Sequence, residues 1–248
     1  MSDTDGQTQV QPPRREKRPR DPEQWVHRSM GAYRNSLQSL EFRPGPAFFE
    51  IADPIVQSRR SLLGYDRLYV FWQAIRNVAQ VTGAAAEIGS YRGGSAYFLA
   101  RAFERVTGAE VPMHVFDTFE GHPAEAISAH DPFHEPGQFG RTSYEDVTTY
   151  LSPFQQLQIH KGDVAASLPQ LPESAYRFVH IDTDLYQPTI VCLEYFVPRL
   201  PPGGVIVVDD YASGKCPGVA KAVVEYLERG SDLQVWDMRT EQLMLVNR

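Results

Sequence analysis

Short apolar runs alternate with longer amphipathic segments along the chain from about residue 84 onward. The apolar runs predict five strands, at Ala84–Ile88, Met113–Phe116, Leu157–His160, Arg177–Asp182 and Val205–Val208. The amphipathic segments between and after them predict helices over Ser95–Val106, Ser143–Leu151, Pro188–Arg199 and Gly218–Arg229. Strands that alternate with helices in this way indicate an α/β fold with a mostly parallel sheet.

Two further strand patterns close the chain. Leu233–Met238 and Gln242–Val246 are separated only by Arg239-Thr240-Glu241, which is typical of an antiparallel hairpin. The whole pattern therefore predicts a seven-stranded sheet whose ligands bind at the carboxyl ends of its strands.

The N-terminal part has a different character. Residues 1–22 are polar, contain prolines and show no apolar periodicity, so we expect a disordered basic tail. Apolar residues recur at helical spacing from Glu23 to about Leu40 and again over Asp66–Val81, and Pro44 and Pro46 break the first of these helices. The expected organisation is a tail over 1–22, a helical cap over 23–82 and a main domain over 83–248 with an insertion at 118–142.

The insertion is rich in glycine and proline and has no periodicity. Loops of this length are usually functional or disordered. His122, His130 and His134 fall within it and could line an acceptor pocket, although most loop histidines are simply solvated.

Composition narrows the class of protein. The chain has 248 residues, of which 42% are hydrophobic, and its formal charge of -7 argues against nucleic acid as a partner. Cys192 and Cys216 are too few for a disulfide framework and favour a reducing cytoplasm. With neither a long apolar span nor an apolar signal segment in the sequence, we expect a soluble, cytoplasmic protein that does not enter a membrane.

The segment between the first strand and its helix has the features of a ligand-binding loop. Gly89 is followed by Gly93-Gly94, and glycines there let the backbone approach a ligand at the N-terminus of a helix. The spacing matches neither the dinucleotide fingerprint nor the phosphate loop. Glu87, two residues before Gly89, suits a ligand with a cationic end, such as S-adenosylmethionine. A glycine-rich turn that binds nothing is the alternative.

Acidic residues stand at or just after each of the five predicted strands. Asp117 could accept both hydroxyls of a ribose, and Asp163 could border an adenine. Asp182, Asp209 and Asp210 would come together on adjacent strands, where they would repel one another unless a cation lay between them. Oxygen ligands favour Mg²⁺, Mn²⁺ or Ca²⁺, and no spacing typical of zinc is present. Alternatively, Asp209 or Asp210 caps a helix or pairs with Lys215 or Lys221.

Four motifs together resemble the macrocin O-methyltransferase family: Glu-Ile-Gly-Ser-Tyr-Arg-Gly-Gly-Ser, Asp-Thr-Phe-Glu-Gly, Asp-Thr-Asp-Leu-Tyr and Pro-Gly-Gly-Val-Ile-Val-Val-Asp-Asp-Tyr. The resemblance extends from about Ser61 to Val246. It implies a Rossmann-like class I methyltransferase fold and methylation of sugar hydroxyls in antibiotic biosynthesis. It also implies S-adenosylmethionine and a divalent ion such as Mg²⁺ as cofactors, a glycosylated or sugar substrate, and a homo-oligomer.

Carried over by position, the resemblance implies metal ligands at Asp182, Asp209 and Asp210. The implied cofactor contacts are Ser61, Glu87, Gly89, Ser90, Tyr91, Arg92, Gly93, Ser95, Asp117, Thr118, Phe119, Ser143 and Asp163. The family commonly has Cys-Gly-Val-Trp/Tyr where this chain has Ile88-Gly89-Ser90-Tyr91, and an aromatic pair where it has Gly162-Asp163-Val164. These departures leave the adenine contacts open.

Methyl transfer to an alcohol requires that a weakly nucleophilic hydroxyl lose its proton. Our hypothesis is that Asp182 acts as metal ligand and nearby base, with His180 as the competing catalytic residue on the same face of the strand. A buried, hydrogen-bonded histidine is the more frequent fate at such a position. Tyr186, Tyr211 and Phe119 could shape a sugar pocket or simply pack. A phenol O-methyltransferase and a non-catalytic binding protein are the alternative functions.

Overall fold

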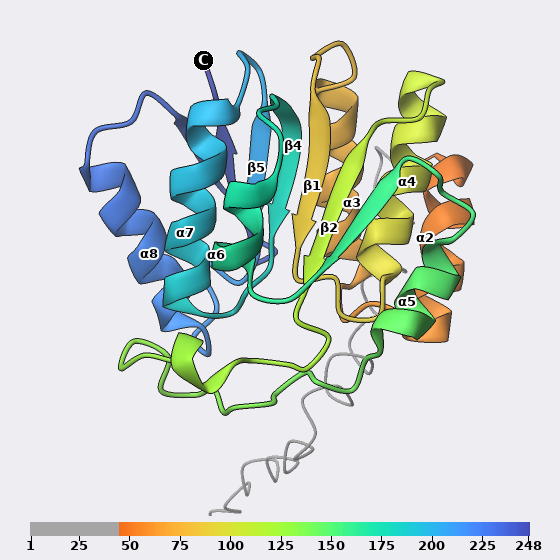
Figure 1. Cartoon of the computed structure of the whole chain (residues 1–248). Helices are drawn as coiled ribbons and strands as arrows, with labels where there is room; N and C mark the ends of the chain where they lie inside the picture. Colours follow the sequence, from red (N-terminus) through yellow and green to blue (C-terminus); the bar gives the residue numbers. More distant parts are fainter. Residues whose placement is uncertain (1–44) are drawn as a thin grey trace, which may run out of the picture.

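The computed structural model describes residues 45–248 and shows a seven-stranded sheet in the order β3-β2-β1-β4-β5-β7-β6 (Figure 1). Its strands are β1 Ala84–Ile88, β2 Met113–Asp117, β3 Leu157–Lys161, β4 Tyr176–Ile181, β5 Val205–Val208, β6 Gln234–Asp237 and β7 Leu243–Val246. The first five are parallel, whereas β7 is antiparallel to both β5 and β6. The predicted fold class and closing hairpin are confirmed, with strand boundaries shifted by at most one residue. The predicted tail and the helix at 23–40 lie outside the described residues.

The register of the central strands places their carboxyl ends side by side. Ile88 at the end of β1 lies opposite Ile181 at the end of β4, which lies opposite Val208 at the end of β5. Every residue of β1 and β5 is buried, as expected for parallel strands covered on both faces. Residues that follow these three strands are therefore held at one edge of the sheet.

Helices cover both faces of the sheet (Figure 1). One face carries α2 Pro46–Ser58, α3 Tyr65–Asn77, α4 Gly94–Thr107 and α5 Tyr144–Leu151, and the other carries α6 Val164–Ser167, α7 Tyr186–Phe196 and α8 Pro217–Glu228. Short 3₁₀ turns occur at Ala124–Ala126, Leu168–Gln170 and Val197–Arg199. Each face has its own cluster of buried apolar side chains.

Helix α2 lies in a segment for which the sequence pattern predicts no helix. Pro46 was expected to break a helix, but it stands at the first turn of α2, where its missing N–H costs no hydrogen bond. Pro54 lies inside the same helix on an exposed side. Phe48 is fully buried and packs edge-on against Phe98 of α4, so α2 shares the core of the sheet domain. The boundary predicted between a cap and a main domain at 82/83 stays a prediction.

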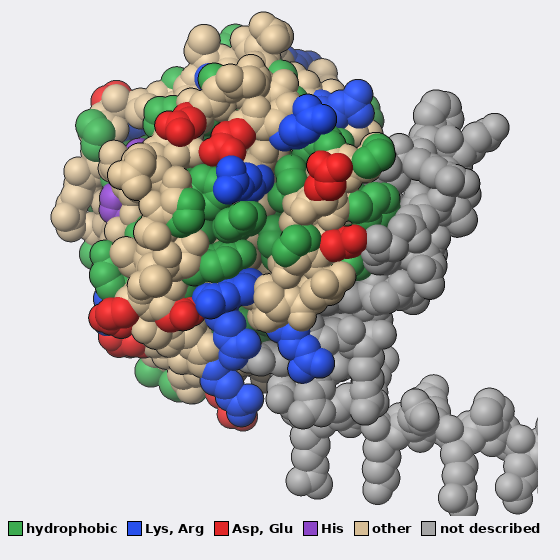
Figure 2. Space-filling view, turned by 90° about the vertical axis from the view of Figure 1, so that its right-hand side faces the viewer, with side chains coloured by type: hydrophobic (Ala, Val, Ile, Leu, Met, Phe, Trp, Pro, Cys, Tyr) green, Lys and Arg blue, Asp and Glu red, His purple; other side chains and the backbone are tan. Residues whose placement is uncertain are grey.

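The side of the molecule that carries α2, α4 and α5 has hydrophobic side chains lying between acidic and basic ones (Figure 2). Ion pairs on this surface join Arg60 to Asp146 and Arg101 to Glu104. Within residues 45–248, we find no helix that combines the length and the apolar character needed to cross a membrane.

Candidate functional site

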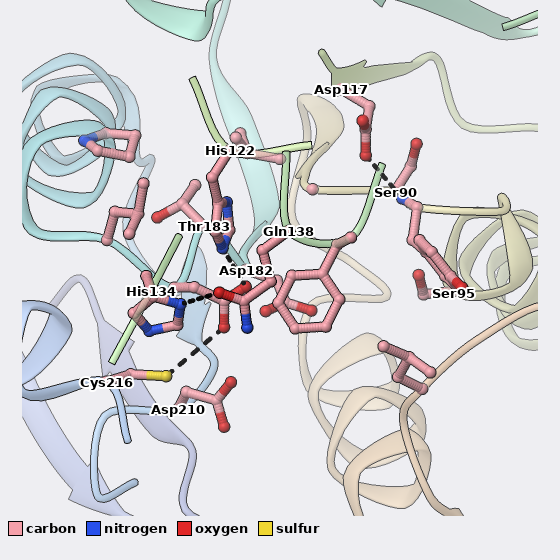
Figure 3. Close-up of a pocket in the computed structure, with 18 of the residues that line it drawn as sticks. Ser90, Ser95, Asp117, His122, His134, Gln138, Asp182, Thr183, Asp210 and Cys216 are labelled. Atoms are coloured by element: carbon pink, nitrogen blue, oxygen red, sulfur yellow. Dashed lines mark hydrogen bonds and ion pairs between the residues drawn. The ribbon is translucent and has the colours of Figure 1, made fainter. Parts of the chain in front are cut away.

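A cavity of about 630 Å³ opens at the carboxyl ends of the strands. Segment 118–142 runs below these strand ends in the view of Figure 1 and contributes to the wall. The cavity has two ends. Ser90, Ser95 and Asp117 lie at one, and Asp182, Asp210 and Cys216 lie at the other (Figure 3).

The first end is built by the turn between β1 and α4. Gly89 has a φ of 91°, and a Cβ there would lie 1.8 Å from the carbonyl oxygen of Asp182, so only glycine fits. Asp117, at the end of β2, accepts hydrogen bonds from the N–H groups of Tyr91 and Phe119, each at 2.7 Å. Burial raises the pKa of Asp117, and these two bonds oppose the rise. The carboxylate therefore ties the turn to the neighbouring strand.

The predicted cofactor contacts divide into two groups. Eight of them line the cavity: Ser61, Gly89, Ser90, Tyr91, Ser95, Asp117, Thr118 and Asp163. Five are not part of its wall: Glu87, Arg92, Gly93, Phe119 and Ser143. Ser143 instead caps α5 by accepting from the N–H of Asp146, and Gly93 is the left-handed residue before α4.

Glu87 and His180 form a buried pair behind the cavity. Their nearest side-chain atoms, Oε1 and Nδ1, are 3.1 Å apart, and both side chains are fully buried. Neither residue lines the cavity. Glu87 is therefore held against a histidine, and the roles predicted for Glu87 in cofactor binding and for His180 in catalysis stay predictions.

Four carboxyl groups crowd the other end of the cavity. Asp182 and Asp184 follow β4, and Asp209 and Asp210 follow β5. Burial, reinforced by neighbouring carboxylates, raises the pKa values of Asp182 and Asp184 well above the usual range. Burial also raises the pKa of Asp209, which is 2% exposed and lies just behind the wall. A cation at this position would relieve the repulsion.

The acidic end fits a divalent metal. Ligand atoms of His180, Asp182 and Asp209 lie within 4.8 Å of one another. Oδ1 of Asp209 is buried and has no hydrogen-bond partner among the described residues. Asp210 adds a carboxylate that faces the cavity. A predominantly oxygen set of this kind suits Mg²⁺ or Mn²⁺.

Arg67, which no sequence pattern singles out, projects from α3 into this cluster. Its guanidinium lies 2.5 Å from Asp209 Oδ2, 2.9 Å from Asp210 Oδ1 and 2.9 Å from Glu241 Oε2. Burial alone would lower the pKa of Arg67, but the carboxylates of Asp209, Asp210 and Asp182 raise it. Lys221, one of the partners considered from sequence, pairs with Glu225 at 2.6 Å instead. Nothing local in the sequence around Arg67 signals its distant acidic partners.

The three loop histidines differ in position. His122 and His134 line the cavity, whereas His130 is exposed and its ring contacts Tyr186. His122 Nε2 lies 3.5 Å from Asp184 Oδ2. Burial, with a contribution from His134, lowers the pKa of His122 to about 4. At neutral pH the cavity therefore contains an uncharged His122 beside Asp184.

A protein-family model described as Macrocin-O-methyltransferase (TylF) matches residues 52–234. The chain belongs to the macrocin O-methyltransferase family. This family member is 30% identical over 183 residues to "8-demethyl-8-(2,3-dimethoxy-alpha-L-rhamnosyl)-tetracenomycin-C 4'-O-methyltransferase" of Streptomyces olivaceus, with 66% of this chain and 70% of the relative covered. The resemblance predicted from sequence is confirmed, and the protein is an O-methyltransferase.

Solved structures agree with the fold of this macrocin O-methyltransferase family member. The O-methyltransferase NovP superposes with a TM-score of 0.70 at 21% identity, covering 91% of this chain and 97% of that one. TomG from Streptomyces achromogenes, solved in complex with SAM, superposes with a TM-score of 0.58 at 17% identity, covering 90% and 99%. The fold is therefore that of class I O-methyltransferases.

Proposed function

We propose that this enzyme transfers a methyl group from S-adenosylmethionine to a sugar hydroxyl of a natural product or nucleotide sugar, with the help of a divalent metal. The observation that carries the proposal is the two-ended cavity, which has the Asp117 carboxylate at one end and a cluster of acids at the other. The name of the Streptomyces olivaceus relative, which acts on a rhamnosyl group, supports a sugar as acceptor.

The residues of the first end suit the donor. Asp117 offers carboxylate oxygens to ribose hydroxyls, as adenosine cofactors require. Ser61, Ser90 and Ser95 are buried, line the cavity and offer hydroxyl groups to polar atoms of a ligand. The complex of TomG with SAM supports this cofactor for the shared fold.

The residues of the acidic end suit a metal and a proton acceptor. Asp182, Asp209 and Asp210 would hold the ion. When bound, the donor supplies an electrophilic methyl group, and the ion acts as a Lewis acid that lowers the pKa of a hydroxyl. Asp184 is the cavity-facing carboxylate nearest to these three in sequence, and its raised pKa suits it to accept the proton of the acceptor hydroxyl.

The acceptor would enter past segment 118–142. Phe133 lines the cavity and its side chain is 61% exposed, which suits an aromatic surface against which a sugar ring can pack. Lys215, Arg239 and Thr240 also line the cavity and add polar groups to the part of the wall that an acceptor would meet. This part of the wall would set which glycoside is accepted.

The test is incubation with S-adenosylmethionine, Mg²⁺ and a panel of glycosylated metabolites and nucleotide sugars, read by mass spectrometry. A substrate gains about 14 Da, the net CH₂ left by the transfer. Asp182→Asn should nearly abolish turnover while S-adenosylmethionine still binds in calorimetry. Asp232→Asn, at an exposed position away from the cavity, is the matched control. Activity of Asp182→Asn within about threefold of wild type, together with indifference to a chelator, would contradict the metal requirement.

A further inference from the structure

Arg67 contacts the carboxylates of the acidic cluster that a metal ion would need. Its guanidinium touches Asp209 and Asp210, two of the three carboxylates to which we assign the metal, and the nearby charge of Asp182 also stabilises it. The Arg67 side chain is 19% exposed and that of Asp209 is 1% exposed, so the contact is largely shielded from solvent. A guanidinium can satisfy buried carboxylates, but it uses the same oxygen lone pairs that a metal would need.

A second acceptor for Arg67 stands beside the cluster. Nη2 of Arg67 is 2.9 Å from Oε2 of Glu241, whose side chain is 52% exposed in the turn between β6 and β7. The turn is fixed there because the carbonyl oxygen of Glu241 accepts a hydrogen bond from the N–H of Ala212 at 3.1 Å. Arg67 can therefore release Asp209 and still keep an anionic partner.

We propose that Arg67 is a built-in counter-ion that neutralises Asp209 and Asp210 in the metal-free protein and, when a divalent ion binds, releases them while it keeps its contact with Glu241. The inference rests on the metal dependence of the proposed function. It gives α3, which precedes the sheet in sequence, a part in setting metal affinity, because α3 supplies the competing charge.

If Arg67 only positioned the metal ligands, its removal would change metal affinity in the opposite direction. If Arg67 held the carboxylates in ligand geometry, its removal would let them spread apart and weaken metal binding. If it competes for them, its removal leaves three uncompensated carboxylates, which lowers the stability of the metal-free protein and strengthens metal binding. Metal affinity and metal-dependent stability thus separate the two roles without any measurement of turnover.

The experiment compares wild type with Arg67→Gln and Arg67→Lys by calorimetric titration of Mg²⁺ and Mn²⁺ and by thermal unfolding with and without each metal. We expect Arg67→Gln to bind the ions roughly tenfold more tightly, which corresponds to about 1.4 kcal/mol of lost competition. Its melting temperature should fall without metal and recover with metal. Arg67→Lys keeps the charge but cannot bridge three carboxylates, so its affinity should lie between the two and it serves if Arg67→Gln does not fold.

Two further variants sharpen the test. Glu241→Gln should weaken metal binding in the wild-type background and have no effect in the Arg67→Gln background, because it acts through Arg67. Arg101→Gln removes a surface ion pair with Glu104 far from the acidic cluster in sequence and should leave metal affinity unchanged. Unchanged or weaker metal binding in Arg67→Gln overturns this inference while leaving the proposed function intact. Absence of divalent-ion binding in the wild type overturns both.

Discussion

Nδ1 of His180 lies 3.1 Å from Oε1 of Glu87, and both side chains are fully buried behind the acidic end of the cavity. The two residues face each other across β1 and β4, where they are register partners. Phe71 of α3 packs against the imidazole, with ring centroids 4.5 Å apart. The pair therefore joins two neighbouring strands of the sheet through buried polar side chains.

Removing the Glu87 carboxylate should lower the stability of the protein and leave its affinity for the cofactor unchanged. Glu87→Ala leaves Nδ1 of His180 without its hydrogen-bond partner in a buried site, and we expect a loss of about 1–3 kcal/mol in the free energy of unfolding. S-adenosylmethionine should bind within about threefold of wild type, because Glu87 does not line the cavity. Chemical unfolding and calorimetry measure the two quantities.

Glu50→Ala, on the exposed side of α2, is the control for stability. A variant at Glu87 that stays stable but binds the cofactor more than tenfold more weakly would instead support the direct cofactor contact predicted from sequence.

Unlike Glu87, Asp117 should contribute to cofactor affinity as well as to stability. Its two carboxylate oxygens accept hydrogen bonds from the N–H groups of Tyr91 and Phe119, which fixes the glycine turn. The same side chain lines the end of the cavity that contains Ser90 and Ser95. Asp117→Ala should weaken S-adenosylmethionine binding by roughly tenfold to a hundredfold and lower the free energy of unfolding by about 1–3 kcal/mol. Calorimetry and chemical unfolding give the two numbers.

Asp163→Ala is the informative comparison, because Asp163 also lines the cavity but mainly caps the short helix α6 through the N–H of Ala165. It should lose about 1 kcal/mol of stability and little affinity. Equal losses of affinity in both variants would argue against a special role for Asp117.

Much of the fold follows from local pattern. Apolar runs such as Val205–Val208 and the glycine turn after Ile88 are short-range signals, and the sheet order follows from standard α/β topology. Helix α2 was not predicted because Pro46 was expected to interrupt a helix, whereas proline is favourable at the first turn of one.

The site was only partly predictable, for a physical reason. Strand β1 is buried on both faces, so alternation carries no information on which face Glu87 uses, and its partner His180 is 93 positions away. Arg67 is separated from Asp209 by 142 positions. Contacts of this range depend on how α3 packs against the sheet, and a single sequence does not encode them in any local motif.

His122 predicts a dependence of stability on pH. Burial and the neighbouring His134 lower its pKa from 6.5 to about 4, with Asp131 opposing the shift. Between those values the unfolded chain binds more protons at this position than the folded protein does, so the contribution of His122 to stability falls as the pH drops from 6.5 through 4. We expect a loss of about 1–3 kcal/mol over this range that His122→Gln reduces.

Unfolding in denaturant at pH 7, 6, 5 and 4 measures this slope. The exposed His130 supplies a control, since His130→Gln should leave the slope unchanged. The same slope in wild type and His122→Gln would show that His122 titrates normally and is not shielded beside Asp184.

Asp131 anchors segment 118–142 to the rest of the enzyme. Its side chain is 1% exposed and accepts hydrogen bonds from the N–H of Tyr186 at 2.9 Å and from the N–H and hydroxyl of Ser128 at 2.9 and 2.6 Å. Tyr186 is the first residue of α7, where unpaired N–H groups favour a negative charge. Gly218 at the start of α8 leaves room for this carboxylate, since a Cβ there would lie 2.0 Å from Asp131 Oδ1.

Asp131→Ala should therefore loosen the loop that carries Phe133 and His134. We expect a loss of about 1–3 kcal/mol in the free energy of unfolding and faster hydrogen exchange across residues 118–142. KM for the acceptor should rise several-fold while S-adenosylmethionine affinity stays near that of wild type, because most of the wall at the donor end lies outside this loop. Glu135→Ala, exposed in the same loop, is the control. Unchanged exchange in the loop of Asp131→Ala would mean that contacts other than this carboxylate hold the segment against the strand ends.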